Sequence, residues 1–227
     1  MVSQMSELPV RLIAALWDTD ADAPRGQRAS ESLAAQGVTR LQVNVADDAA
    51  RGGLAMNHYR RPIEAVVAVT GGDVAAVLDE LDSVAGEVQA WEAALRAPLD
   101  PALPTGERVD ALANIAFLRH PEELAYDEWR RRWLDEHTRV AIDTQATFGY
   151  YQNIVSRPLT DGAVGVDAIV EELFPMGAIT DQHFFYGSGG DEAELRRRQT
   201  LMLESVVRIG AERAIDLVPT SRYDYPL

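Results

Sequence analysis

The sequence contains no cysteine, and its basic residues are far outnumbered by its acidic ones. Without cysteine, the chain cannot form disulfide bonds, use a thiol in catalysis or build a thiolate metal site. Lysine and arginine together number 21 against 36 aspartates and glutamates, which gives a net charge of −15. A surface this acidic repels phosphate backbones and anionic lipids, so we expect neither nucleic acid nor a membrane as a partner.

Long apolar runs are also missing. No stretch approaches the ~20 apolar residues of a membrane-spanning helix. The first residues, MVSQMSELPV, lack the basic start and apolar centre of a signal peptide. We therefore expect a cytoplasmic protein. Hydrophobic residues make up 47% of the 227 positions, which is enough for a packed core in one large domain or two small ones.

The two halves of the chain follow the same order of elements. In each half a helix is followed by a strand that opens at a glycine, GVTRLQVNV at 37–45 and GYYQNIV at 149–155. The next strands are IEAVVAV at 63–69 and VDAIVEEL at 166–173, and an aspartate begins the helix after each. This order is typical of a ferredoxin-like repeat. The sequence therefore predicts an α+β fold in which two ferredoxin-like repeats form an intramolecular, pseudo-dimeric α+β barrel.

Prolines mark the junction between the repeats. We place a degenerate repeat at 1–100, a proline-rich linker at 101–110 and a second repeat, with the candidate site, at 111–227. The expected strands are 11–17, 38–45, 63–69, 112–118, 150–155, 166–174 and 217–223. The expected helices are 27–36, 74–95, 191–209 and the one that begins at 126. The segment 176–190 shows no clear pattern.

The helix that begins at Tyr126 carries the strongest functional signal. On a 3.6-residue period, Trp129, Trp133 and His137 share one stripe, and charged residues occupy the opposite side. Gly149 is expected to stop this helix, and a strand follows at once. Two indoles and one imidazole should therefore face the sheet.

The second half, from about 111 to 225, resembles an EthD-family domain, one branch of the dimeric α+β barrels. The residues that carry the resemblance are Trp129, Trp133, the Glu136-His137 pair, the strand 151–155 and the segment 170–174. The sequence departs from the family at Leu173, where tryptophan is common. The first half has no such tryptophan or histidine, so we expect one site per chain. The resemblance implies cofactor-free chemistry on an aromatic or polyketide-like molecule, or an accessory role in oxidative degradation.

His137 is the candidate catalytic residue. An imidazole with an ordinary pKa near ~6.5 can give or take a proton at neutral pH. Glu136 points about 100° away on the helix, so Glu171, Glu172 or Asn153 would have to orient the ring. The alternative is a core histidine that hydrogen-bonds to the backbone.

The residues expected to bind substrate are Trp129, Trp133, Tyr151, Asn153, Glu172 and His183. The indoles would form a flat wall, and core packing is the alternative for them. Tyr151 and Asn153 share one strand face, which we assign to the pocket, and Tyr150 and Gln152 share the other. The aromatic run that begins at His183 would either cover the pocket as a lid or anchor a long loop.

No histidine pair such as HxH or HxxxH is present, so we expect neither a metal nor another cofactor. We expect an EthD-like oxidoreductase or lyase that abstracts a proton from a small molecule, leading to oxygenation, dehydration or cyclisation. A non-catalytic ligand-binding or accessory barrel is the alternative, and a haem-handling relative is a third reading. The prediction also leaves room for a homodimer of the whole chain.

Overall fold

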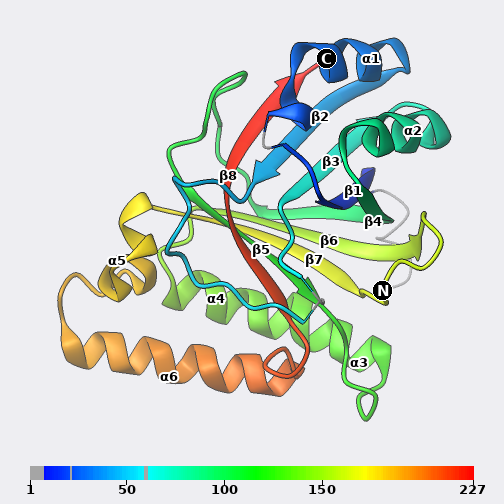
Figure 1. Cartoon of the computed structure of the whole chain (residues 1–227). Coiled ribbons are helices and arrows are strands. Elements are labelled where there is room, and N and C mark those ends of the chain that lie inside the picture. The colour runs from blue at the N-terminus through cyan, green and yellow to red at the C-terminus, as the bar shows by residue number, and fades with distance from the viewer. Residues whose placement is uncertain (1–7, 21, 59–60) are drawn as a thin grey trace.

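The computed structural model describes residues 8–20, 22–58 and 61–227. In this part of the chain, antiparallel strands close into one barrel, and helices lie against its outside in two groups (Figure 1). The helices of the first half cover one side of the barrel, and those of the second half cover the other. None of the described helices has both the length and the apolar character needed to cross a membrane.

The first half contributes the blue to green part of the barrel in Figure 1. Its elements are β1 (Val10–Trp17), the 3-10 turn η2 (Ala23–Arg25), α1 (Gln27–Ala35), β2 (Val38–Val45), β3 (Ala65–Gly71), α2 (Val74–Val84) and β4 (Glu87–Leu99). Helix α2 begins where the Asp73 carboxylate accepts a hydrogen bond from the Ala76 N–H at 3.0 Å. This cap satisfies one of the N–H groups that the first turn of a helix leaves without a partner.

The second half repeats this order with additions. Its strands are β5 (Leu112–Leu118), β6 (Gly149–Pro158), β7 (Ala168–Phe174) and β8 (Asp216–Pro226). Its helices are α3 (Tyr126–Arg131), the π-helical turn η3 (Arg132–His137), α4 (Thr138–Thr144), the 3-10 turn η4 (Met176–Ile179), α5 (Gln182–Tyr186) and α6 (Glu192–Ile209). Asp191 caps α6 by accepting hydrogen bonds from the Ala193 and Glu194 N–H groups.

The strand order shows how the two halves combine. The strands lie in the order β4-β1-β3-β2 in the first half and β8-β5-β7-β6 in the second, which is the order of a ferredoxin-like unit. The antiparallel pairs β2–β8 and β4–β6 then join the halves and close the barrel. The predicted fold class, two ferredoxin-like repeats in one intramolecular barrel, is confirmed.

Side chains alternate between the inside and the outside of the barrel. On β1, Leu12 and Leu16 pack outward under the helices of the first half, whereas Ile13 and Trp17 pack inside the barrel. Under the helices of the second half, Trp129 packs in a third core with residues of β6 and β7. Each half therefore has its own core between helix and sheet, and the halves share the barrel interior.

The predicted helix 74–95 is wrong. Helix α2 ends at Val84, and β4 begins at Glu87 and pairs with both β1 and β6. β4 is covered on both faces, because Ala90 packs under the helices while Trp91 packs inside the barrel. A strand buried on both faces shows no alternation of apolar and polar residues, so its sequence does not distinguish it from the continuation of a helix.

The end of the helix that begins at Tyr126 also differs from the prediction. The helix ends at Thr144, and Gly149 opens β6 instead of stopping the helix. A Cβ atom on Gly149 would lie 2.7 Å from the Leu173 Cδ1 atom on the neighbouring strand. Glycine is needed here because β6 and β7 approach closely, and not because it ends the helix.

Candidate functional site

The helix-covered face of β5, β7 and β6 carries most of the predicted site. Trp129 and Trp133 are buried here, as predicted, and their rings stack with centroids 5.3 Å apart. The Trp129 Nε1–H donates to the Ile209 carbonyl oxygen at 3.1 Å. The Trp133 Nε1–H is buried without a hydrogen-bond partner in the described structure. The Trp129 indole therefore has its hydrogen bond within the core, whereas the Trp133 N–H has no acceptor in the described structure.

His137 lies at the end of the π-helical turn and faces α6. The residue is 7% exposed, and its Nδ1 atom lies 2.9 Å from the Ser205 Oγ atom. Burial lowers the pKa of the imidazole to about 4. The ring is therefore uncharged at neutral pH and is a weak base. The expectation that Glu171, Glu172 or Asn153 orients it is wrong, because a serine of the helix layer takes that place.

Glu172 is the most unusual titratable group on this face. Its β7 position pairs with Asn114 on β5 and with Tyr150 on β6, so the three side chains lie side by side across the sheet. The Oε1 atom of Glu172 and the Oδ1 atom of Asn114 are both buried without a partner in the described structure. Burial raises the pKa of Glu172 to about 8. The carboxyl can therefore give or take a proton near neutral pH.

Tyr150 and Gln152, not Tyr151 and Asn153, face the helices. The Gln152 side chain donates to the Thr138 hydroxyl at 2.9 Å and accepts from Arg96 at 2.7 Å. The Tyr150 phenol hydrogen-bonds to Thr138 and Gln152, and burial raises its pKa. The face assigned to the pocket from the sequence is therefore wrong. Both faces of β6 carry buried polar residues. The alternation of side chains along the strand therefore puts Tyr150 and Gln152 on one face and Tyr151 and Asn153 on the other, but it does not show which face meets the helices.

Tyr151 and Asn153 belong to the barrel interior. The Arg222 guanidinium lies 4.6 Å from the centre of the Tyr151 ring, and Asn153 Oδ1 accepts from Arg11 Nε at 2.7 Å. Glu171 lies in the same interior and accepts from Arg222 at 2.7 Å.

Two amides of β2 complete the shell around Glu171. The Gln42 and Asn44 side chains donate to its carboxylate oxygens at 2.9 and 2.8 Å. Because its oxygens are held by partners from both halves, this interior carboxylate connects the repeats and does not await a ligand.

The segment 176–190 packs over the end of β7. The Phe185 ring of α5 stacks on the Phe174 ring with centroids 4.3 Å apart. The pKa of the next residue, Tyr186, is raised by burial and then by the nearby Glu172 carboxylate. The His183 ring is hydrogen-bonded within its own segment, to the Ser188 hydroxyl at 2.6 Å. Helix α5 therefore brings Tyr186, rather than His183, close to Glu172.

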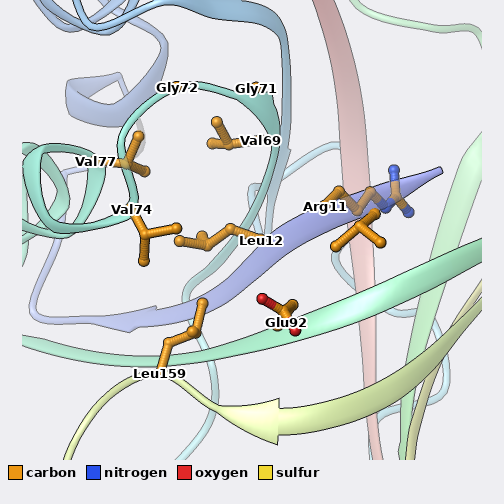
Figure 2. A pocket seen from close by; sticks show the side chains of 10 residues that line it. Arg11, Leu12, Val69, Gly71, Gly72, Val74, Val77, Glu92 and Leu159 are labelled. Atoms are coloured by element: carbon orange, nitrogen blue, oxygen red, sulfur yellow. The ribbon is translucent and has the colours of Figure 1, made fainter.

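Two surface pockets stand out in the described part of the chain, and neither is lined by His137 or Glu172. The first, of about 190 Å³, lies between α2 and the sheet of the first half (Figure 2). Its lining is mainly aliphatic, and the Glu92 carboxylate in it is already paired with Arg157 at 2.8 Å. The second, of about 540 Å³, lies between residues of the segments 46–57 and 62–63 and the start of β8. No group of three or more histidine and acidic side chains in the described residues is placed to hold a metal ion.

Comparison with known proteins bears on the fold. No family model and no curated protein matches the chain. A suspected monooxygenase from Lactobacillus acidophilus NCFM has a similar structure, with a TM-score of 0.52 and 10% identity over 97% of both chains. An anthrone oxidase-like protein is similar with a TM-score of 0.55 and 9% identity, over 97% of this chain and 94% of that one.

These likenesses agree with the fold described above, a closed α+β barrel made of two ferredoxin-like units. At these identities a structural likeness establishes the fold alone, and function has to be argued from the site. The site includes residues that sequence reasoning missed, namely Asn114, Tyr150 and Ser205. A signal for Ser205 was present, because it lies four residues before Ile209 on the buried stripe of α6. The others could be found only once the pairing of β5, β7 and β6 was known.

Proposed function

We propose that the protein is a small-molecule enzyme that abstracts a proton from an aromatic or polyketide-like substrate at the helix-covered face of the second repeat. The observation that carries this proposal is the buried carboxyl of Glu172, which has an unpartnered oxygen and a pKa of about 8. Structural carboxylates normally have partners for their oxygens when buried. A carboxyl without such partners, next to polar side chains, is typical of a site where protons move.

The chemistry assigned to Glu172 is acid–base. At pH 7 about a tenth of a carboxyl with this pKa is ionised, so both protonation states are accessible. The carboxylate takes a proton from an activated C–H or O–H group of the substrate, which leaves a substrate anion. That anion can be oxidised by dioxygen as co-substrate, can expel a hydroxide that leaves as water with the proton returned by the Glu172 carboxyl, or can close a ring. We keep oxygenation, dehydration and cyclisation open.

His137 remains the alternative acid–base residue. Its pKa of about 4 makes it a weaker base than Glu172 at neutral pH, and its Nδ1 atom is occupied by Ser205. On the EthD resemblance it would act directly on the substrate. In the arrangement described here its better supported role is to hold the π-helical turn against α6. The two residues can be separated by experiment.

The first assay should use an anthrone, because one solved structure with this fold is named as anthrone oxidase-like and another as a suspected monooxygenase. Dioxygen uptake and the absorbance of the product would be followed for the wild type, Glu172→Gln and His137→Gln. We expect Glu172→Gln to lower kcat by about 100-fold or more, the usual range for loss of a general base. We expect His137→Gln to change kcat by less than about 10-fold.

The pH profile provides the second readout. If Glu172 is the base, kcat rises with pH through about 8, where its carboxyl ionises. The reverse pattern of losses, with His137→Gln inactive and Glu172→Gln active, would assign the reaction to the imidazole. Ligand binding without any turnover of phenols or anthrones would instead identify a binding or accessory protein.

A further inference from the structure

Four buried polar atoms on the helix-covered side of the second repeat have no partner in the described structure. They are Asn114 Oδ1, Glu172 Oε1, Gln145 Oε1 and Trp133 Nε1. We call these residues the Glu172 cluster. Buried polar atoms are nearly always hydrogen-bonded, and leaving one unpaired is costly. Four of them in one layer indicate that something outside the chain completes their hydrogen bonds.

The members of the cluster come from several elements. Asn114 and Glu172 are direct neighbours across the β5–β7 pair. Trp133 belongs to η3 and packs in the core above this part of the sheet. Gln145 lies in the segment that joins α4 to β6, and the next residue, Ala146, donates its N–H to the Phe185 carbonyl of α5 at 2.8 Å. Helix, loop and sheet thus each contribute an unpartnered polar group to this side of the second repeat, and Asn114 and Tyr150 lie directly beside Glu172.

We propose that the Glu172 cluster binds an uncharged ligand that donates hydrogen bonds through hydroxyl or amino groups. This inference rests on the proposed function and narrows its substrate class. Three of the four unpartnered atoms are carbonyl or carboxyl oxygens, which accept hydrogen bonds, and one is an N–H, which donates. A ligand with several O–H or N–H groups matches this set, and a ligand that only accepts hydrogen bonds does not.

The charges around the cluster argue against an anionic ligand. The arginine that acts electrostatically on Tyr150 is Arg96. Its guanidinium already donates to Gln152 Oε1 at 2.7 Å and to the Leu134 carbonyl oxygen at 3.0 Å. The Tyr150 hydroxyl is likewise engaged by Thr138 and Gln152. An incoming carboxylate would meet the Glu172 carboxyl group and amide oxygens, while Arg96 already has other partners.

The test is a binding series with three probes of nearly the same size. Resorcinol offers two hydroxyl donors, resorcinol dimethyl ether offers only acceptors, and dihydroxybenzoate adds a carboxylate. Binding to the wild type would be measured by calorimetry, which needs no turnover. We expect the dissociation constant of resorcinol to be at least about 10-fold lower than that of either other probe. Equal affinities for resorcinol and its dimethyl ether would overturn the proposal.

Two variants locate the binding. Asn114→Leu removes one acceptor at nearly constant volume, and we expect it to weaken resorcinol binding by about 10-fold without lowering Tm. Asn57→Leu is the matched control, because Asn57 is exposed and lines the second surface pocket. Unchanged binding to a folded Asn114→Leu variant, or loss of binding only in Asn57→Leu, would contradict the assignment.

Binding and turnover fail independently. If resorcinol binds as described but no phenol or anthrone is turned over, the ligand class stands and the proposed enzyme does not. If an anthrone is turned over but the three probes bind alike, the reverse holds. Glu172→Gln separates the two further, because glutamine keeps an acceptor oxygen and an N–H donor group at this position while losing the titratable proton.

Discussion

At the residue scale, burial acts on two titratable side chains of the same layer in opposite directions. It raises the pKa of Glu172 to about 8 and lowers the pKa of His137 to about 4. In both cases the low-dielectric surroundings disfavour the charged form. Both groups are therefore mainly uncharged at pH 7, and both should leave a mark on the pH dependence of stability.

For Glu172, stability should fall as the pH rises. In the unfolded chain the carboxyl titrates near 4.5, and in the folded protein near 8. Between these values the folded state holds a proton that the unfolded state has released, so the free energy of unfolding decreases with pH. The loss is at most about 5 kcal/mol, at about 1.4 kcal/mol per pH unit. Urea unfolding at about pH 5 and about pH 9 should show this loss in the wild type and not in Glu172→Gln.

The control for this measurement is Glu204→Gln, which removes an exposed carboxyl of α6. In this variant the free energy of unfolding should fall with pH as steeply as in the wild type. A wild-type slope that persists in Glu172→Gln would show that another group carries the pH dependence, and the acid–base role of Glu172 would lose its support.

For His137 the sign is reversed, and the effect lies at acidic pH. The imidazole titrates near 6.5 in the unfolded chain and near 4 in the folded protein. In this interval the unfolded state binds a proton that the folded state does not, so the free energy of unfolding falls as the pH falls. The size is about 3 kcal/mol at most. His137→Gln should lose this dependence, whereas His183→Gln, whose side chain is 25% exposed, should keep it.

At the element scale, close approach between strands decides where glycine is required. Gly149 begins β6 opposite Leu173 on β7. A methyl group at Gly149 would lie 2.7 Å from the Leu173 Cδ1 atom and 2.9 Å from its Cγ atom. The leucine is fully buried, so it has little freedom to move away.

Gly149→Ala should therefore destabilise the protein by about 1–3 kcal/mol through overpacking. Gly165→Ala is the matched control, because a Cβ atom there meets nothing within 4 Å. Thermal unfolding of the two variants measures the difference. Equal Tm values would mean that β6 and β7 can separate at this point, which would also loosen the sheet face that carries Glu172.

At the scale of the whole molecule, the barrel interior belongs to both halves. Trp91 of the first half packs against Phe117 of the second with ring centroids 5.8 Å apart. The Gln42 and Asn44 side chains of the first half donate to Glu171 of the second. A half on its own would expose this surface and leave the carboxylate without its partners.

We therefore expect neither 1–100 nor 111–227 to unfold cooperatively when produced alone. Mixed or co-expressed, the two fragments should form a stable one-to-one complex, because the β2–β8 and β4–β6 pairs can then reform. Circular dichroism during heating and size-exclusion chromatography measure both outcomes. Cooperative, monomeric unfolding of 111–227 alone would show that the second repeat, with its candidate site, is an independent domain.

The sequence by itself determined the repeated order of elements and the burial of Trp129, Trp133 and His137, because periodicity and helix caps are local properties. It could not place β4, whose two buried faces hide the alternation of a strand. Nor could it decide that Tyr150 rather than Tyr151 meets the helices. The pairing of β5, β7 and β6 placed Asn114 beside Glu172, and the helices above them excluded the water that would otherwise hold the pKa of that carboxyl at its usual value. Burial depends on residues distant in the chain, so only the tertiary structure could identify Glu172 as the unusual group.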